Sequence, residues 1–348
     1  MARQNSSDNT ALENLKHDLK SGTLGNCYLF HGEEAFLRDS YYTKMKKKLL
    51  SGPAEEFNYH RFNSENMNWD DVADAVESIP MMAERSRVEI TDINLFKENE
   101  EDREKLVSIL ENIPNYCCLV FLYDAIPYTH DGRLKKLTAA IKKHVQIVEF
   151  RRQSPAELRT WIRRLAASHG KEIDASDADY LAFMTDSSMV SIQSELIKLA
   201  SYTESSAITR QDIDLLVTPT LTAGGFDISN AAADGDYARA LEILRDVLTI
   251  NADPIQILGA VSAQMRRIYY AKVLLENGLG VQDLMEICKM GNYAAKITIS
   301  SARGLSPQAC ANMAWLCLEA DRQIKSSFDD GERILELLLI RMAQEAKA

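Results

Sequence analysis

The sequence predicts an α/β domain built on a mostly parallel sheet, followed by helical domains. Up to about residue 150, short apolar runs alternate with helix-like segments, and after that point only helical periodicity recurs. The length of 348 residues and the hydrophobic content of 46% allow two or three domains with buried cores. A net charge of −11 argues against wrapping nucleic acid through the global field, although local basic patches remain possible.

The elements of the first 150 residues follow from apolar runs and turn residues. The expected strands are 27–30, 57–62, 87–93, 117–123 and 145–150. The expected helices are 33–50, a helix capped by Asn68 and stopped by Pro80, 100–112 and 132–143. In a strand, the adjacent Cys117 and Cys118 point to opposite faces. Strands that alternate with helices favour a parallel sheet covered on both faces.

Beyond residue 150 the pattern is helical, and the strand signals stop. Ser154, Pro155 and Glu157 form a helix start with a capping box. The expected helices are 155–169, 176–185, 188–204 and a short one that opens at 208–212. Residues 219–225 (PTLTAGG) are expected to be a linker. The remainder is expected to be all helical.

The stretch 28–37 (YLFHGEEAFL) predicts a strand, a glycine turn and a helix, which is the geometry of a phosphate loop. A phosphate loop needs several glycines, a lysine and a Ser or Thr. This one has only Gly32, and Glu33 and Glu34 stand where the lysine and hydroxyl are wanted, so they would repel a triphosphate. Asp92, alone after an apolar run, indicates a strand edge more than a magnesium site. We therefore expect a degenerate phosphate loop that binds no nucleotide.

Other catalytic chemistry is not indicated. The six histidines and six cysteines lack metal-ligand spacing, and no nucleophile elbow is present, so neither a metal site nor a catalytic residue is expected. The scattered cysteines predict reduced thiols in a cytoplasmic protein. Because no apolar run reaches 18 residues, no membrane span is expected.

Residues 78–85 (SIPMMAER) place Met81 and Met82 between a helix-stopping proline and a charged turn. Methionine is a common filler of cores, so both side chains could be buried. The alternative is an apolar tip that is exposed for the pocket of a partner. Each such side chain, if fully buried on binding, would contribute ~1.5–3 kcal/mol.

Taken together and in this order, these segments resemble the delta subunit of the bacterial DNA polymerase III clamp loader. The resemblance spans residues 28 to about 343 and rests on colinearity. The matching segments are YLFHGEE, SIPMMAERSRVEI, FLYDAIPYTHDGRLKKL, SELIKL (194–199), FDISNAAADGDYARALEIL, PIQILGAVSAQMRRIYYAK and EADRQIKS.

The resemblance implies an AAA+-like domain (1–150), a small helical lid domain (151–220) and a helical collar domain for oligomerisation (221–348). It implies a subunit that binds and opens the ring-shaped sliding clamp for loading onto primed DNA, without hydrolysing ATP and without a cofactor. The clamp-binding tip falls on Met81 and Met82, where family members often have Leu or Phe.

The implied partners are the sliding clamp, the other subunits of a hetero-pentamer held by the collar, and primer–template DNA within the complex. Residues 44–48 and 133–136, both basic, could contact neighbouring subunits or DNA. Two other readings stay open: a catalytically active AAA+ ATPase, and a helical-repeat scaffold. The strand-rich first 150 residues disfavour the scaffold.

Overall fold

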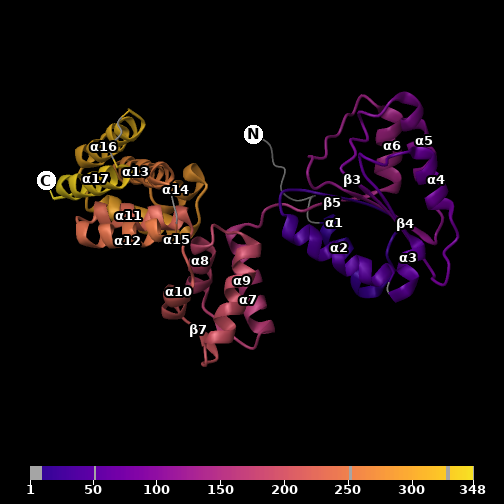
Figure 1. The fold of residues 1–348 in the computed structure, drawn as a ribbon, viewed down its shortest axis with the longest axis horizontal. Coiled ribbons are helices and arrows are strands. Elements are labelled where there is room, and N and C mark those ends of the chain that lie inside the picture. Colours follow the sequence, from indigo (N-terminus) through magenta and orange to yellow (C-terminus); the bar gives the residue numbers. More distant parts are fainter. Residues whose placement is uncertain (1–9, 51, 251–252, 327–329, 348) are drawn as a thin grey trace. The chain divides into compact units, whose positions relative to one another are not determined.

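The chain forms two compact units, Met1–Gln153 and Ser154–Ala348, which Figure 1 colours from indigo to magenta and from pink to yellow. The structure is a computed structural model that describes residues 10–50, 52–250, 253–326 and 330–347. The first unit contains a parallel sheet with helices, and the second is mainly helical, so the expected fold class is confirmed. The expected separation of a lid domain from a collar domain near residue 220 stays a prediction.

The first unit is built on a five-stranded sheet with the order β2-β3-β4-β1-β5, in which every neighbouring pair is parallel. Its strands are β1 (Cys27–His31), β2 (Tyr59–Phe62), β3 (Ser86–Thr91), β4 (Cys117–Leu122) and β5 (Gln146–Glu149). Because all strands run the same way, their carboxyl ends meet at one edge of the sheet and their amino ends at the opposite edge. We call these the carboxyl edge and the amino edge.

Helices cover both faces of this sheet (Figure 1). On one face lie α1 (Thr10–Ser21) and α2 (Ala35–Leu49); on the other lie α4 (Trp69–Glu77), α5 (Glu100–Glu111) and α6 (Lys135–His144). Cys117 packs in the core under α4–α6, whereas Cys118 packs in the core under α1 and α2. The predicted opposite orientation of the two cysteines is therefore confirmed.

Two elements of the first unit differ from the expectation. Helix α1, which buries Leu15, was not foreseen. The strand expected at 57–62 begins only at Tyr59, because a 3-10 turn (Gly52–Ala54) and α3 (Glu55–Asn58) precede it. The Asn58 amide nitrogen donates to the Ala54 carbonyl oxygen at 2.7 Å, which holds this helical turn closed.

The second unit begins with four helices: α7 (Pro155–Ser168), α8 (Ala175–Met184), α9 (Met189–Tyr202) and α10 (Arg210–Leu216). The capping box of Ser154 and Glu157 is present at the start of α7, as predicted. The expectation that no strand follows residue 150 is wrong. β6 (Glu172–Ile173) and β7 (Ala207–Ile208) pair in parallel, and two residues each are too few to produce a periodic signal.

The linker expected at 219–225 is also wrong. Thr220 caps α11 (Leu221–Ala233), so both glycines of that stretch are helical and buried. A Cβ on Gly225 would lie 2.4 Å from the Ala260 Cβ, and one on Gly224 would lie 2.7 Å from Val247 Cγ2. These glycines therefore permit close helix packing rather than flexibility.

Six more helices complete the second unit. They are α12 (Tyr237–Thr249), α13 (Pro254–Glu276), α14 (Val281–Cys288), α15 (Asn292–Arg303), α16 (Pro307–Ser326) and α17 (Gly331–Glu345). Together with α11 they share one continuous apolar core. Within the described parts of the chain, no helix is long and apolar enough to cross a membrane.

Candidate functional site

The glycine turn after β1 lies at the carboxyl edge and is closed by the protein's own backbone. Gly32 has a φ of +127°, and a Cβ there would lie 2.2 Å from the Phe150 carbonyl oxygen. The backbone N–H of Glu34 donates to that same oxygen at 2.9 Å. This glycine therefore serves a close contact with the end of β5, and the amide of Glu34 is already bonded within the fold.

The two glutamates of this turn add negative charge at the start of α2. Glu33 is exposed and forms an ion pair with Arg152, with 3.3 Å between Oε2 and Nε. Partial burial raises the pKa of the Glu34 carboxyl above its ordinary value. Neither side chain supplies the positive charge or the hydroxyl group with which phosphate loops hold a nucleotide and its magnesium ion.

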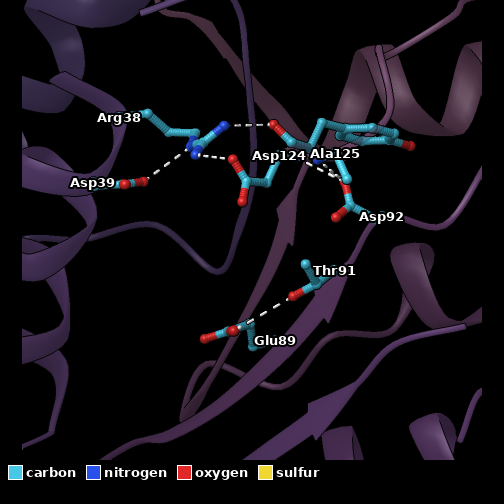
Figure 2. Close-up of polar contacts among 8 residues, drawn as sticks. Arg38, Asp39, Glu89, Thr91, Asp92, Asp124 and Ala125 are labelled. Carbon is cyan, nitrogen blue, oxygen red and sulfur yellow. Dashed lines mark hydrogen bonds and ion pairs between the residues drawn. The ribbon is translucent and has the colours of Figure 1, made fainter. Parts of the chain in front are cut away.

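At the same edge, Asp92 at the end of β3 organises the loop that follows β4 (Figure 2). Asp92 Oδ1 accepts hydrogen bonds from the backbone N–H groups of Asp124 at 2.8 Å and Ala125 at 3.0 Å. Asp92 itself has a φ of +56°, a left-handed conformation that Asp tolerates better than most residues. One oxygen of the carboxylate is thus engaged by backbone amides.

Arg38 completes the carboxyl edge from α2 (Figure 2). Its side chain is almost fully buried, and its guanidinium donates to the Tyr123 carbonyl oxygen at 2.8 Å and to Asp124 Oδ1 at 2.5 Å. It also pairs with Asp39 at 3.1 Å. Arg38 thus pairs with Asp39 and Asp124, while Asp92 bonds the backbone of the same loop. Among the described residues, no group of three or more His, Cys, Asp or Glu side chains could hold a metal ion.

The segment 78–85, which we call the tip segment, lies at the amino edge between α4 and β3. The structure exposes both methionines: Met81 is 58% exposed and Met82 is 87% exposed. Ile79 beside them is 79% exposed. The core alternative for Met81 and Met82 is thus wrong, and three large apolar side chains project from one short stretch. Met82 has a φ of +58°, which is uncommon for a residue with a side chain.

Two polar side chains, the buried Asn58 and the half-buried Arg85, hold the backbone of the tip segment in its middle and at its C-terminal end. The Asn58 amide nitrogen donates to the Met81 carbonyl oxygen at 2.7 Å, and Asn58 Oδ1 accepts from the Met81 N–H at 2.6 Å. At the C-terminal end of the tip segment, the Arg85 guanidinium donates to acceptors just ahead of β1 and at the start of β4. These acceptors are Leu24 O, Gly25 O, Asn26 Oδ1 and Cys117 O, at 2.7–3.2 Å.

The sequence-predicted residues thus fall into two groups at opposite edges of the sheet. Gly32, Glu33 and Glu34 lie at the carboxyl edge, while Met81 and Met82 lie at the amino edge. The sequence did not indicate a role for Asn58, because this residue lies inside the strand that was expected at 57–62. The sequence also did not indicate a role for Arg38, whose partner Asp124 is 86 residues away.

A five-stranded parallel sheet covered by helices on both faces, followed by a mainly helical unit, defines a two-unit protein of the α/β plus α-helical class. The chain matches two family models: "DNA polymerase III, delta subunit" over residues 28–151 and "DNA polymerase III delta subunit, C-terminal domain" over residues 223–342. Together these models cover more than half of the chain. The chain therefore belongs to the family of DNA polymerase III delta subunits, the clamp-loader subunits of this DNA replication enzyme.

The similar proteins match this chain over more than nine tenths of its length. DNA polymerase III subunit delta of Bacillus subtilis is 27% identical over 93% of this chain and 94% of its own length. A probable DNA polymerase III subunit delta of Aquifex aeolicus is 21% identical over 91% of each chain. The solved structure of the Bacillus subtilis DNA clamp loader delta protein matches with a TM-score of 0.62. It is 24% identical to this chain and covers 96% of it and 99% of its own length, which supports the fold.

Proposed function

We propose that this chain binds the ring-shaped sliding clamp through Met81 and Met82 and opens the ring for loading onto primed DNA. The observation that carries the proposal is the exposed apolar pair on a tip segment that is hydrogen-bonded to Asn58 through Met81 and to the chain ahead of β1 through Arg85. Contiguous apolar side chains that are exposed on a monomer commonly mark an interaction site. A partner with an apolar pocket beside its ring interface fits this surface.

Burial of the tip would supply part of the free energy of clamp binding, and opening the ring sets a further requirement. Full burial of two methionine side chains would contribute ~3–6 kcal/mol, at ~1.5–3 kcal/mol each. Binding alone does not open a ring, because a ligand shifts an equilibrium only by its differential affinity for the two states. The tip must therefore fit the open interface better than the closed one.

We further propose that the chain neither binds nor hydrolyses ATP and acts as an accessory subunit. Three features of the carboxyl edge support this. The Glu34 amide is bonded to Phe150, Glu33 and Glu34 would repel phosphate, and Arg38 and Asp124 pair with each other. ATP binding in neighbouring subunits would then control when the tip engages the clamp.

The other partners are proposed from the second unit. The helices from α11 onward would form the collar that joins the subunits of a hetero-pentamer, which would in turn bind primer–template DNA. Large apolar side chains exposed on α13 and α16 support such contacts; they are Tyr270, Val273, Trp315 and Leu318. A cytoplasmic location stays a prediction that rests on the six free cysteines.

The test is a mixture of the full chain with the sliding clamp of its own organism on a sizing column, without nucleotide. Co-elution is expected. Separate elution of the two proteins, together with magnesium-dependent ATP turnover by the isolated chain, would favour the active ATPase instead.

A further inference from the structure

We propose that Asn58 is a positioning residue for clamp binding, because it fixes the backbone of Met81 so that the Met81 and Met82 side chains project outward. This inference rests on the proposed function. It assigns to Asn58 no contact with the clamp, since its side chain is only 2% exposed.

Asn58 makes two hydrogen bonds to the tip segment and a third within its own helical turn. Its amide nitrogen donates to Met81 O and to Ala54 O, both at 2.7 Å, and its Oδ1 accepts from Met81 N–H at 2.6 Å. The side chain therefore bonds both backbone polar groups of Met81. An apolar residue of similar size could make none of these bonds.

The helical turn that contains Asn58 is itself bonded to the sheet. Glu55, in the same helical turn, accepts a hydrogen bond from Arg87 at 2.9 Å. Arg87 lies in β3 and is 1% exposed, and its guanidinium stacks over the Tyr59 ring at 4.1 Å. Asn58 thus links the tip segment, which has no regular secondary structure, to a helical turn that is bonded to β3.

The backbone next to Met81 shows why such a hold is needed. Met82 adopts left-handed φ, which persists only where the surroundings enforce it. If the hold on Met81 is removed, the stretch gains other conformations, including some that fold the two methionines back on the surface. Binding must then order the tip again, and this cost lowers the affinity.

The experiment compares Asn58→Ala with Asn66→Ala in the full chain. Asn66, which is exposed, is the control for the loss of an asparagine that bonds the backbone, because its side chain bonds Asn63 and Arg61 at the carboxyl end of β2. For Asn58→Ala we expect clamp affinity to fall about tenfold, which corresponds to ~1.4 kcal/mol. For Asn66→Ala we expect the affinity of the unmodified chain. Both are measured well below their melting temperatures.

Hydrogen exchange at the Met81 amide supplies a readout that a loss of general stability would not move. In the unmodified chain this amide should exchange slowly although its side chain is exposed, and in Asn58→Ala it should exchange fast while strand amides stay protected. Fast exchange of Met81 in the unmodified chain would overturn the proposal, and that measurement needs no variant.

Clamp affinity separates this proposal from the proposed function. If Asn58→Ala binds the clamp as tightly as the unmodified chain while charged substitutions at Met81 and Met82 abolish binding, the positioning role fails and the proposed function stands. If the charged substitutions also leave binding intact, the proposed function fails.

Discussion

The two edges of the same parallel sheet have opposite characters. At the carboxyl edge, Arg38, Asp92 and Asp124 bond one another and the backbone, and the glycine turn is bonded to the end of β5. At the amino edge, the side chains of Met81 and Met82 are exposed although the backbone of Met81 is hydrogen-bonded through both its N–H and its carbonyl oxygen. A polar cluster whose groups already bond one another has few hydrogen-bonding groups left for a ligand. Exposed apolar side chains on a held backbone, in contrast, can bind a partner without first being ordered.

The comparison also separates stability from binding. Buried hydrogen bonds at the carboxyl edge contribute to the folded state, because a buried group that loses its partner costs ~1–3 kcal/mol. Exposed methionines contribute little to folding, since they lie in water in both the folded and the unfolded chain. Substitutions at the carboxyl edge should thus lower stability and spare clamp binding, and those at the tip should do the reverse.

The largest effect is expected for Met81→Asp combined with Met82→Asp. Placing two carboxylates in an apolar pocket should lower clamp affinity more than a hundredfold, since ~3–6 kcal/mol of burial is lost. The melting temperature should stay unchanged, because both side chains are exposed and aspartate tolerates the left-handed backbone at Met82. Titration calorimetry with the clamp measures the affinity.

The matched control for this pair is Val190→Asp combined with Leu215→Asp. Both residues are exposed apolar side chains, on α9 and α10 of the second unit. It should bind the clamp like the unmodified chain. An equal loss of affinity in this control would show that added charge, and not the tip, weakens binding.

The next effect is expected for Gly32→Ala, which should destabilise the first unit by roughly 3 kcal/mol through strain and overpacking. The cause is the collision of the new Cβ with the Phe150 backbone at 2.2 Å. Gly22→Ala is the control, since Gly22 also has a positive φ, of +78°, but has open space around its Cβ position. Denaturant unfolding should give a cost of only ~1–2 kcal/mol there. Equal costs for the two variants would contradict the close contact.

A smaller effect is expected for Asp92→Ala, at about 1 kcal/mol of stability, since backbone N–H groups of the β4 loop lose their acceptor but stay open to water. Asp92→Asn keeps an oxygen in that place and should cost much less. Clamp affinity should not change in either variant. Weaker clamp binding by a correctly folded Asp92→Ala variant would show that the carboxyl edge also affects binding. That result would contradict the separation of stability from binding.

The smallest effect is expected for Glu33→Ala combined with Glu34→Ala. Stability should change by about 0.5 kcal/mol or less, as for other surface positions. Calorimetry with ATP and magnesium should detect no binding by this variant or by the unmodified chain. Binding by either would contradict the account of the carboxyl edge.

The carboxyl-edge turn could be predicted because a phosphate loop needs neighbouring residues, and Gly32, Glu33 and Glu34 are adjacent. From the sequence, exposure of Met81 and Met82 was one of two alternatives, because methionine is also common in hydrophobic cores. The hold of Asn58 on Met81 spans 23 residues and depends on which strands are neighbours, which one sequence does not reveal.

The two wrong expectations in the second unit have a similar origin. In the local sequence, Gly224 and Gly225 indicate a linker. In the fold they lie in α11 against Val247 of α12 and Ala260 of α13, where a larger side chain would collide. The short β6–β7 pair is stabilised by contacts between distant segments, so its four residues carry no periodic pattern. In both cases tertiary packing decided a structure that local sequence signals left open or misassigned.

The central claim is that the tip opens the clamp without ATP hydrolysis by this chain, and ring opening can be measured directly. A donor and an acceptor dye are placed across one interface of the sliding clamp, and the full chain is added without nucleotide. We predict that energy transfer falls with the unmodified chain and stays unchanged with Met81→Asp combined with Met82→Asp. Unchanged energy transfer while the unmodified chain is bound would contradict the account.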